Sequence, residues 1–435
     1  MTMRIVTAIA DALADPERVA AVTTRPGNEL VLSGRPMRQW QPVGLSDAHP
    51  AVSLLFAELG AADPAQWPRA HAHLAAALAA PAPPPLPALY AGAVSLAFAA
   101  HAAALATGGY ATLLDRLDGA VAGQARQRAA TLRARLDAGE PIGEWSGYDV
   151  VTGATGVGRH LLARRDRAGG KAAEEVGAAL RDMLDLLVRL ALTGDATAGD
   201  RRVPAWWVRH DPAAEHAGTA GHLNLGLAHG VPGPLALLAL AWRAGVRVDR
   251  HAEAAAAMAA LLTDLRREDA AGPYWPNWTG SGADERLRRV RDVWCYGAAG
   301  LGRALYLAGT AFGEKDWTDT AEAAVRGAFA TAGEHSVRDY ALCHGWAGLL
   351  QIACRMAHDT GDPAYAVAAD GFADRIRAGH DPGLPFGYRY AHAAAARDTD
   401  RPGLLEGAAG IALALHCHAT GAPPATGWDA ALLLD

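Results

Sequence analysis

The sequence predicts an all-α protein, an α/α toroid in which an inner ring of helices is wrapped by an outer ring. Three observations predict this fold. Alanine makes up much of the 51% hydrophobic share, and alanine is the best helix former. A Gly-x-x-Gly motif followed by an apolar run recurs along the chain. Amphipathic segments separate the copies of this motif.

The glycine motif marks the inner helices. The first glycines of its copies are Gly92, Gly153, Gly230, Gly297, Gly345 and Gly407, at intervals of 48 to 77 residues. In the copy that begins at Gly92, Ser95 stands where the second glycine would be. The run after each motif is apolar nearly all round, which predicts a helix buried on most sides. We expect the glycines to permit a sharp turn into this helix and a close approach of neighbouring turns.

The segments between the motifs predict the outer helices. They carry charges at helical spacing and cover residues 115–140, 172–192, 251–270 and 317–335. The alternation of buried and half-buried helices predicts two layers built from about six to seven helix pairs. A linear α-solenoid is the main alternative, although its repeats are usually shorter and more regular.

We expect one domain over residues 1–435. Residues 1–88 would supply N-terminal helices, with another helix pair, and the proline-rich loop "PAPPPLP" (81–87). Residues 89–418 carry the glycine repeats. Residues 70–114 are uncharged, but the prolines break them and the following run is weakly hydrophobic, so we expect a buried helix there and no membrane span.

Composition narrows the functional classes. Four cysteines in 435 residues are too few for a disulfide scaffold, and the N-terminus makes a poor signal peptide. Both features predict a cytoplasmic protein. A net charge of −6 without a basic cluster gives no reason to expect nucleic-acid binding.

Polar residues gather immediately before the first glycine of several motifs. This position holds Ala91, Thr152, His229, Tyr296, His344 and Glu406. The residue before it is Cys295 in one motif and Cys343 in the next. Because equivalent positions of successive repeats should face the same rim of the toroid, we expect these side chains to lie close together.

Cys295, Cys343 and His344 form the candidate metal site. Thiolate and imidazole are ligands that zinc prefers, and three protein ligands with one open position is the catalytic arrangement. The alternative is that the cysteines are small buried residues, as free cysteines often are. Cys354 and Cys417 lie within apolar helical runs, and for them we favour this structural interpretation.

Other residues near the motifs could handle protons or charge. His229 is placed as an acid or base, and the alternative is a hydrogen-bonded structural histidine. Asp149 could orient such a histidine or cap a helix. Arg291 and Arg401 each stand six residues before a first glycine, where an arginine could stabilise an oxyanion or form an ordinary ion pair. The remaining histidines, including His210 and His222, lack this register and are interpreted as structural or solvent-facing.

The chain resembles the lanthionine synthetase C-like family, the lanthipeptide cyclases, from about Leu89 to Leu415. The segments "RDVWCYG", "LCHGWAG", "LNLGLAHGVPG", "GYDVVTGATG" and "LLEGAAG" carry the resemblance. It implies an α/α toroid with one zinc ion per chain, held by Cys295, Cys343 and His344. It also implies functional roles near the metal for the four residues that match the family's pattern, which are His229, Asp149, Arg291 and Tyr296.

The implied reaction adds cysteine thiols of a precursor peptide to dehydroalanine or dehydrobutyrine in the same peptide. The products are lanthionine or methyllanthionine thioether rings. Zinc would lower the pKa of the substrate thiol, and Arg291 could stabilise the enolate. The implied partners are the dehydrated precursor, a separate dehydratase and an exporter, the last giving a peripheral contact with the membrane.

Two other functions stay open. A related enzyme would add glutathione or another small thiol to dehydrated residues in proteins. A non-catalytic scaffold within a modification complex is the third hypothesis, although a scaffold does not need an open metal site.

Overall fold

The computed structural model describes residues 1–32, 34–37, 40–81, 88–198, 201–210, 221–280, 289, 291–333, 337–392 and 394–435. The chain divides into two compact units. The first unit contains residues 1–86, 90–117 and 337–429. The second unit contains residues 87–89, 118–336 and 430–435. The single domain predicted for residues 1–435 stays a prediction.

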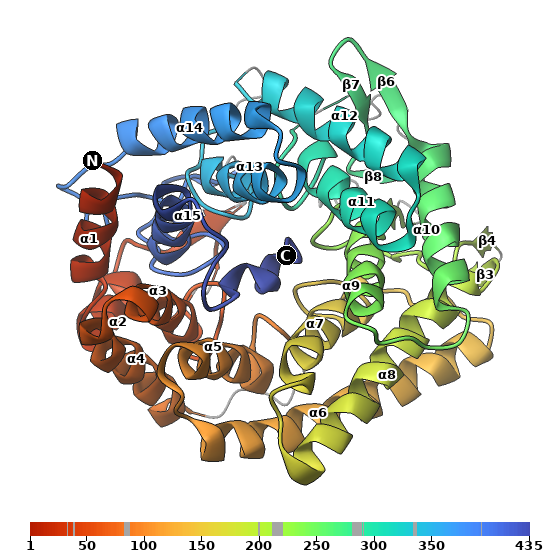
Figure 1. The fold of residues 1–435 in the computed structure, drawn as a ribbon, viewed down its shortest axis with the longest axis horizontal. Helices are drawn as coiled ribbons and strands as arrows, with labels where there is room; N and C mark the ends of the chain where they lie inside the picture. The colour runs from red at the N-terminus through yellow and green to blue at the C-terminus, as the bar shows by residue number, and fades with distance from the viewer. Residues whose placement is uncertain are drawn as a thin grey trace. The chain divides into compact units, whose positions relative to one another are not determined.

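The first unit is built from helices of two kinds. Its helices are α1 (Thr2–Ala12), α2 (Pro16–Thr24), α3 (His49–Ala62), α4 (Trp67–Ala79), α5 (Gly92–Thr107), α13 (Trp346–Thr360), α14 (Pro363–Ala378) and α15 (Ala408–Thr420). It also contains the 3₁₀ turn Pro64–Gln66 and the strand pair β1 (Leu30–Leu32) and β2 (Arg35–Met37). Helix α3 packs on α4, α13 on α14, and α15 on α1. Figure 1 shows α13 beside α14.

Burial separates the helices of this unit into two layers. Nearly every residue of α3 and α15 is buried, whereas α4 and α14 bury one face. The buried helices contact one another in the order α5, α3, α15 and α13. The alternation of buried and half-buried helices predicted from the sequence is therefore confirmed in this unit. The helix pair expected within the first 80 residues is α3 with α4.

The second unit repeats this arrangement. Its helices are α7 (Ala154–Arg165), α8 (Gly170–Leu192), α9 (Pro232–Arg243), α10 (His251–Leu265), α11 (Ala298–Phe312) and α12 (Lys315–Thr331). Helix α6 (Ala111–Asp137) belongs to this unit from residue 118 onward. Helix α7 packs on α8, α9 on α10, and α11 on α12 (Figure 1). The buried helices α7, α9 and α11 contact in sequence, and α8 contacts α10.

Short antiparallel strand pairs lie in the loops of the second unit. They are β3 (Ala196–Ala198) with β4 (Arg201–Val203), β5 (Leu223–Asn224) with β8 (Trp278–Thr279), and β6 (Arg267–Asp269) with β7 (Gly272–Tyr274). The last pair corrects one prediction, because the helix expected over 251–270 ends at Leu265. Gly272 adopts a φ of 110°, which lets the chain turn back as a hairpin. Residues 334–336, at the end of the helix expected over 317–335, lie outside the described residues.

The second glycine of the motif permits a close backbone approach. A Cβ added at Gly156, Gly300 or Gly410 would lie 2.0, 2.0 or 1.9 Å from the carbonyl oxygen six residues earlier. Only glycine tolerates this contact, which folds the preceding loop onto the first turn of the buried helix. Gly297, a first glycine, adopts a φ of 88° directly before α11. The close approach is therefore confirmed at Gly156, Gly300 and Gly410, and a left-handed turn directly before the helix is found at Gly297.

Gly410→Ala should lower the free energy of unfolding by about 1–3 kcal/mol, because the new methyl group meets the Leu404 carbonyl. Gly371→Ala, in α14, is the matched control. Nothing lies within 4 Å of a Cβ at this position, so the change should stabilise the protein by up to about 1 kcal/mol. Urea unfolding of both variants tests this, and equal stability of the two would show that the close approach is not required.

No helix among the described residues is both long enough and apolar enough to cross a bilayer. The uncharged region 70–114 contains part of α4 and the buried helix α5, as predicted.

Candidate active site

Asp149 and His229 form a hydrogen-bonded pair in the second unit. Asp149 lies in the turn before α7, and His229 lies in the turn before α9. The Asp149 Oδ2 and His229 Nδ1 atoms are 2.6 Å apart. The Asp149 side chain is fully buried, and 26% of the His229 side chain is exposed. A carboxylate can only accept, so Nδ1 carries the proton and the other ring nitrogen, Nε2, is left as the atom that can exchange a proton.

The second oxygen of Asp149 is held by its own turn. Asp149 Oδ1 accepts hydrogen bonds from the Thr152 backbone amide at 2.7 Å and from the Thr152 hydroxyl at 3.1 Å. The Arg128 guanidinium donates to the Thr152 carbonyl at 2.5 Å. Burial lowers the pKa of Arg128, and the charge of Asp149 opposes that shift. These contacts fix the carboxylate, and through it the orientation of the His229 ring.

Aromatic side chains surround His229. The Trp145 ring stacks on the imidazole with centroids 4.9 Å apart and an interplanar angle of 28°. Trp145 also packs edge-on against His210 at 4.4 Å and His222 at 6.0 Å. The ring centroid of Trp278 lies 6.4 Å from that of His222. These rings form an aromatic wall beside His229, and Trp145 covers one face of its imidazole.

Tyr296 lies beside the same pair. Its ring centroid is 6.5 Å from that of His229, and its hydroxyl accepts a 3.0 Å hydrogen bond from the Asn224 amide. The Ala228 backbone amide donates to the Cys295 carbonyl at 3.3 Å. The segment that precedes His229 therefore runs along the segment that contains Cys295 and Tyr296.

The backbone around Cys295 is anchored by buried contacts within the second unit. Trp294 is fully buried and donates from its indole nitrogen to the Leu432 carbonyl at 2.9 Å. Arg303, one turn into α11, binds the Leu434 carbonyl. The last residues of the chain thus hold the start of α11, and with it the position of Cys295.

Cys343 and His344 occupy the turn before α13 in the first unit. The Cys343 amide donates to the Leu405 carbonyl at 2.8 Å. His344 Nε2 lies 3.8 Å from Asp339 Oδ2, and the His344 ring lies 5.4 Å from that of Tyr390. Burial raises the pKa of Asp339 to about 6, and the charge of His344 opposes that shift.

Cys295, Cys343 and His344 form a cluster that could hold a metal ion, because their ligand atoms all lie within 4.8 Å of one another. Two thiols and one imidazole are a donor set that fits Zn²⁺. None of the four cysteines forms a disulfide bond.

The model of the family described as "Lanthionine synthetase C-like protein" matches residues 39–433. The chain belongs to this family. "Nisin biosynthesis protein NisC" of Lactococcus lactis subsp. lactis is 24% identical over 217 residues. That alignment covers 47% of this chain and 48% of the relative, so the chain matches about half the length of this curated protein.

A solved structure titled "Nisin cyclase" resembles the chain over most of its length. The TM-score is 0.73 at 20% sequence identity, and the match covers 91% of this chain and 93% of that one. This likeness shows the fold, which is the α/α toroid predicted from the sequence. The family predicted from the sequence motifs is also confirmed.

The two arginines at equivalent positions differ in their surroundings. Arg401 forms ion pairs with Glu406 and Asp47 and packs over the Tyr390 ring at 4.2 Å. The ion-pair interpretation is therefore confirmed for Arg401. The half-buried Arg291 side chain makes no hydrogen bond or ion pair with any residue that the structure describes.

Three residues at the site were missed by sequence reasoning. Trp145, Asn224 and Arg128 contact the residues singled out from the sequence, but none stands at a shared position relative to a motif glycine. Asn224 lies within "LNLGLAHGVPG", one of the segments that carry the family resemblance, but nothing in that segment singles it out. His210 and His222, interpreted as structural or solvent-facing, lie in the aromatic wall around His229.

Proposed function

We propose that the chain is a zinc-dependent lanthipeptide cyclase. It would add cysteine thiols of a dehydrated precursor peptide to dehydroalanine or dehydrobutyrine residues of the same peptide. The Cys295–Cys343–His344 cluster carries this proposal, because an open zinc site of thiol and imidazole ligands suits the activation of a substrate thiol. Membership of the lanthionine synthetase C-like family supports it.

Cys295, Cys343 and His344 would hold the zinc ion. When bound, zinc supplies a Lewis acid that lowers the pKa of a coordinated thiol. The segment 224–229 runs beside the Cys295 segment, so His229 and Tyr296 flank the position of this ligand.

The residues of the second unit would manage charge and protons. As the substrate sulfur bonds to the β-carbon, the double-bond electrons move to the α-carbon and its amide oxygen. Arg291, whose guanidinium has no protein partner among the described residues, would stabilise this enolate. His229 Nε2 would carry the proton that passes from the thiol to the α-carbon, with Asp149 holding the ring. Tyr296 would orient the substrate beside His229.

The substrate is a peptide that a separate dehydratase has already modified, and an exporter would remove the product. Free cysteines support a reducing, cytoplasmic location.

Ring closure does not change the mass of the peptide, so the test counts free thiols. The purified protein is incubated with a synthetic peptide that carries a dehydroalanine and a cysteine, and the remaining thiols are alkylated and counted by mass spectrometry. Loss of alkylation without a mass change supports the cyclase. Turnover only after glutathione is added, with a glutathione adduct, supports the thiol-transfer alternative. A zinc-loaded protein that does neither supports the scaffold.

A further inference from the structure

Asn224 is a buried polar residue of the second unit that contacts Tyr296, and the proposed reaction gives it no role. It pairs with Trp278 where strands β5 and β8 meet, and its backbone carbonyl accepts a 3.3 Å hydrogen bond from the Val231 amide. The Asn224 residue is 0% exposed. A buried amide forms its hydrogen bonds within the protein, so the partners of this side chain indicate what it does.

The two ends of the Asn224 amide have different partners. Its Oδ1 atom accepts a 3.0 Å hydrogen bond from the Gly226 backbone amide, which can only donate. This contact assigns the oxygen end of the side chain, so Nδ2 faces the Tyr296 hydroxyl, at 3.0 Å. Because an amide NH₂ group can only donate, the Tyr296 hydroxyl oxygen is the acceptor.

The direction of this hydrogen bond restricts where the Tyr296 hydroxyl hydrogen points. It cannot point at Asn224, because the group that faces it is itself a donor. The hydrogen is therefore directed to an acceptor other than Asn224. Donation to the hydroxyl oxygen also polarises the O–H bond, which makes the hydroxyl a stronger donor.

The same segment holds the Tyr296 ring. Gly226 has no room for a side chain, because an added Cβ would lie 2.5 Å from Tyr296 Cδ1 and 2.5 Å from the Cys295 carbonyl oxygen. The Trp278 ring meets the Tyr296 ring edge-on, with centroids 6.3 Å apart. Asn224, Gly226 and Trp278 therefore fix both the ring and the hydroxyl of Tyr296, whose ring lies 6.5 Å from that of His229.

We propose that Asn224 is a positioning residue that fixes the Tyr296 hydroxyl as a hydrogen-bond donor to the substrate. The inference rests on the proposed cyclase and gives Tyr296 a part in its chemical step. The acceptor is the amide oxygen of the dehydrated residue, on which negative charge grows as the thiolate adds to the β-carbon. Tyr296 acts there together with Arg291, and a donor that is oriented in advance stabilises the charge without having to turn.

Asn224→Asp reverses the hydrogen bond with little change in the size of the side chain. One carboxylate oxygen keeps the Gly226 contact, and the other accepts the Tyr296 hydroxyl hydrogen, which is then lost to the substrate. Ring closure of the model peptide should slow by about tenfold or more, mainly in kcat, because the lost contact strengthens as charge develops.

The same change in a Tyr296→Phe background shows whether Asn224 acts through the hydroxyl. With the hydroxyl already absent, Asn224→Asp should alter the rate by no more than about threefold. An equal loss in both backgrounds would overturn the proposal, because Asn224 would then act through the fold of the segment 224–229. No loss in either background would overturn it as well.

Infrared spectroscopy measures the direction of the hydrogen bond without peptide or zinc. The phenol C–O stretch depends on whether the hydroxyl accepts or donates, and the difference between the wild type and Tyr296→Phe isolates the band of Tyr296. Asn224→Asp should shift this band, and an unchanged band would overturn the proposal. A wild type that closes no rings, with the band shifted as expected, would overturn the cyclase and leave the Asn224–Tyr296 contact established.

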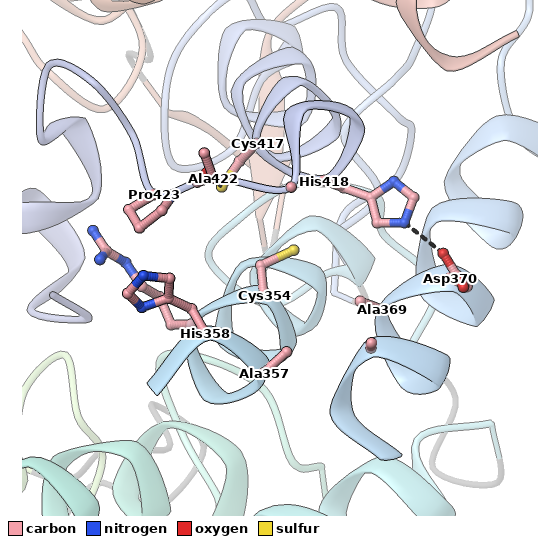
Figure 2. Close-up of a pocket in the computed structure, with 12 residues that line it drawn as sticks. Cys354, Ala357, His358, Ala369, Asp370, Cys417, His418, Ala422 and Pro423 are labelled. Carbon is pink, nitrogen blue, oxygen red and sulfur yellow. Dashed lines mark hydrogen bonds and ion pairs between the residues drawn. The ribbon is translucent and has the colours of Figure 1, made fainter. Parts of the chain in front are cut away.

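Two control variants lie in the first unit. Asn28→Asp makes the same exchange at another buried amide, whose hydrogen bonds join it to backbone groups. His358→Ala removes an exposed ring of α13, at the cavity among α13, α14 and α15 that Figure 2 shows. Both variants should keep the wild-type rate and the Tyr296 band. A shifted band in either would contradict the assignment of the signal to Asn224.

Discussion

His229→Ala should slow ring closure by about two to four orders of magnitude and leave the bound zinc in place. Asp149 holds His229 Nδ1 at 2.6 Å, so Nε2 is the nitrogen available to carry the proton to the α-carbon. Removing the imidazole removes the acid–base group without touching Cys295, Cys343 or His344. The rate is measured by thiol alkylation of the model peptide, and zinc is measured by mass spectrometry of the metal.

His210→Ala is the matched control for this change. His210 packs against the same Trp145 ring, at 4.4 Å, but it is not bonded to Asp149. It should keep a rate within a few-fold of the wild type. Equal rates for the two variants would remove His229 from the mechanism, and loss of zinc from His229→Ala would make it a ligand instead.

Cys295→Ala should remove about one equivalent of zinc and reduce ring closure to the uncatalysed rate. The cluster supplies three ligands, and removal of one thiol leaves a pair that holds the ion poorly. Zinc per chain and the rate with the model peptide are measured on the same preparation, and circular dichroism reports whether the helices are intact.

His71→Ala serves as the control for handling and folding. His71 is exposed on α4 and contacts the Tyr110 hydroxyl, away from the motif turns. It should keep both zinc and activity. A Cys295→Ala protein that is folded and retains all its zinc would contradict the metal site, and one that loses zinc but cyclises normally would contradict the zinc-dependent reaction.

Local sequence determined the layers and the register of the candidate site. An apolar run after a glycine pair produces a buried helix wherever it occurs, because burial depends on the side chains of that run. Three copies of the motif share one close approach, since a Cβ at Gly156, Gly300 or Gly410 would meet the carbonyl six residues earlier. The gathering of Cys295 with Cys343 and His344 could therefore be predicted from their shared position.

Tertiary structure decided what each side chain near the motifs contacts. Arg291 and Arg401 have the same spacing from a glycine, yet Arg401 is held by Glu406 and Asp47. Asp149 was expected either to cap a helix or to orient a histidine; it contacts His229 and the Thr152 turn, whereas α7 begins at N-cap Gly153 without a side-chain cap.

The stacking of Trp145 on His229 and the anchoring of Trp294 by Leu432 had no sequence signal. These contacts join segments far apart in the chain, and no local period encodes which distant side chain a folded loop will meet. The sequence by itself determined the toroid and the shared register of the candidate site residues. Only the folded chain decided their partners, because long-range packing selects them.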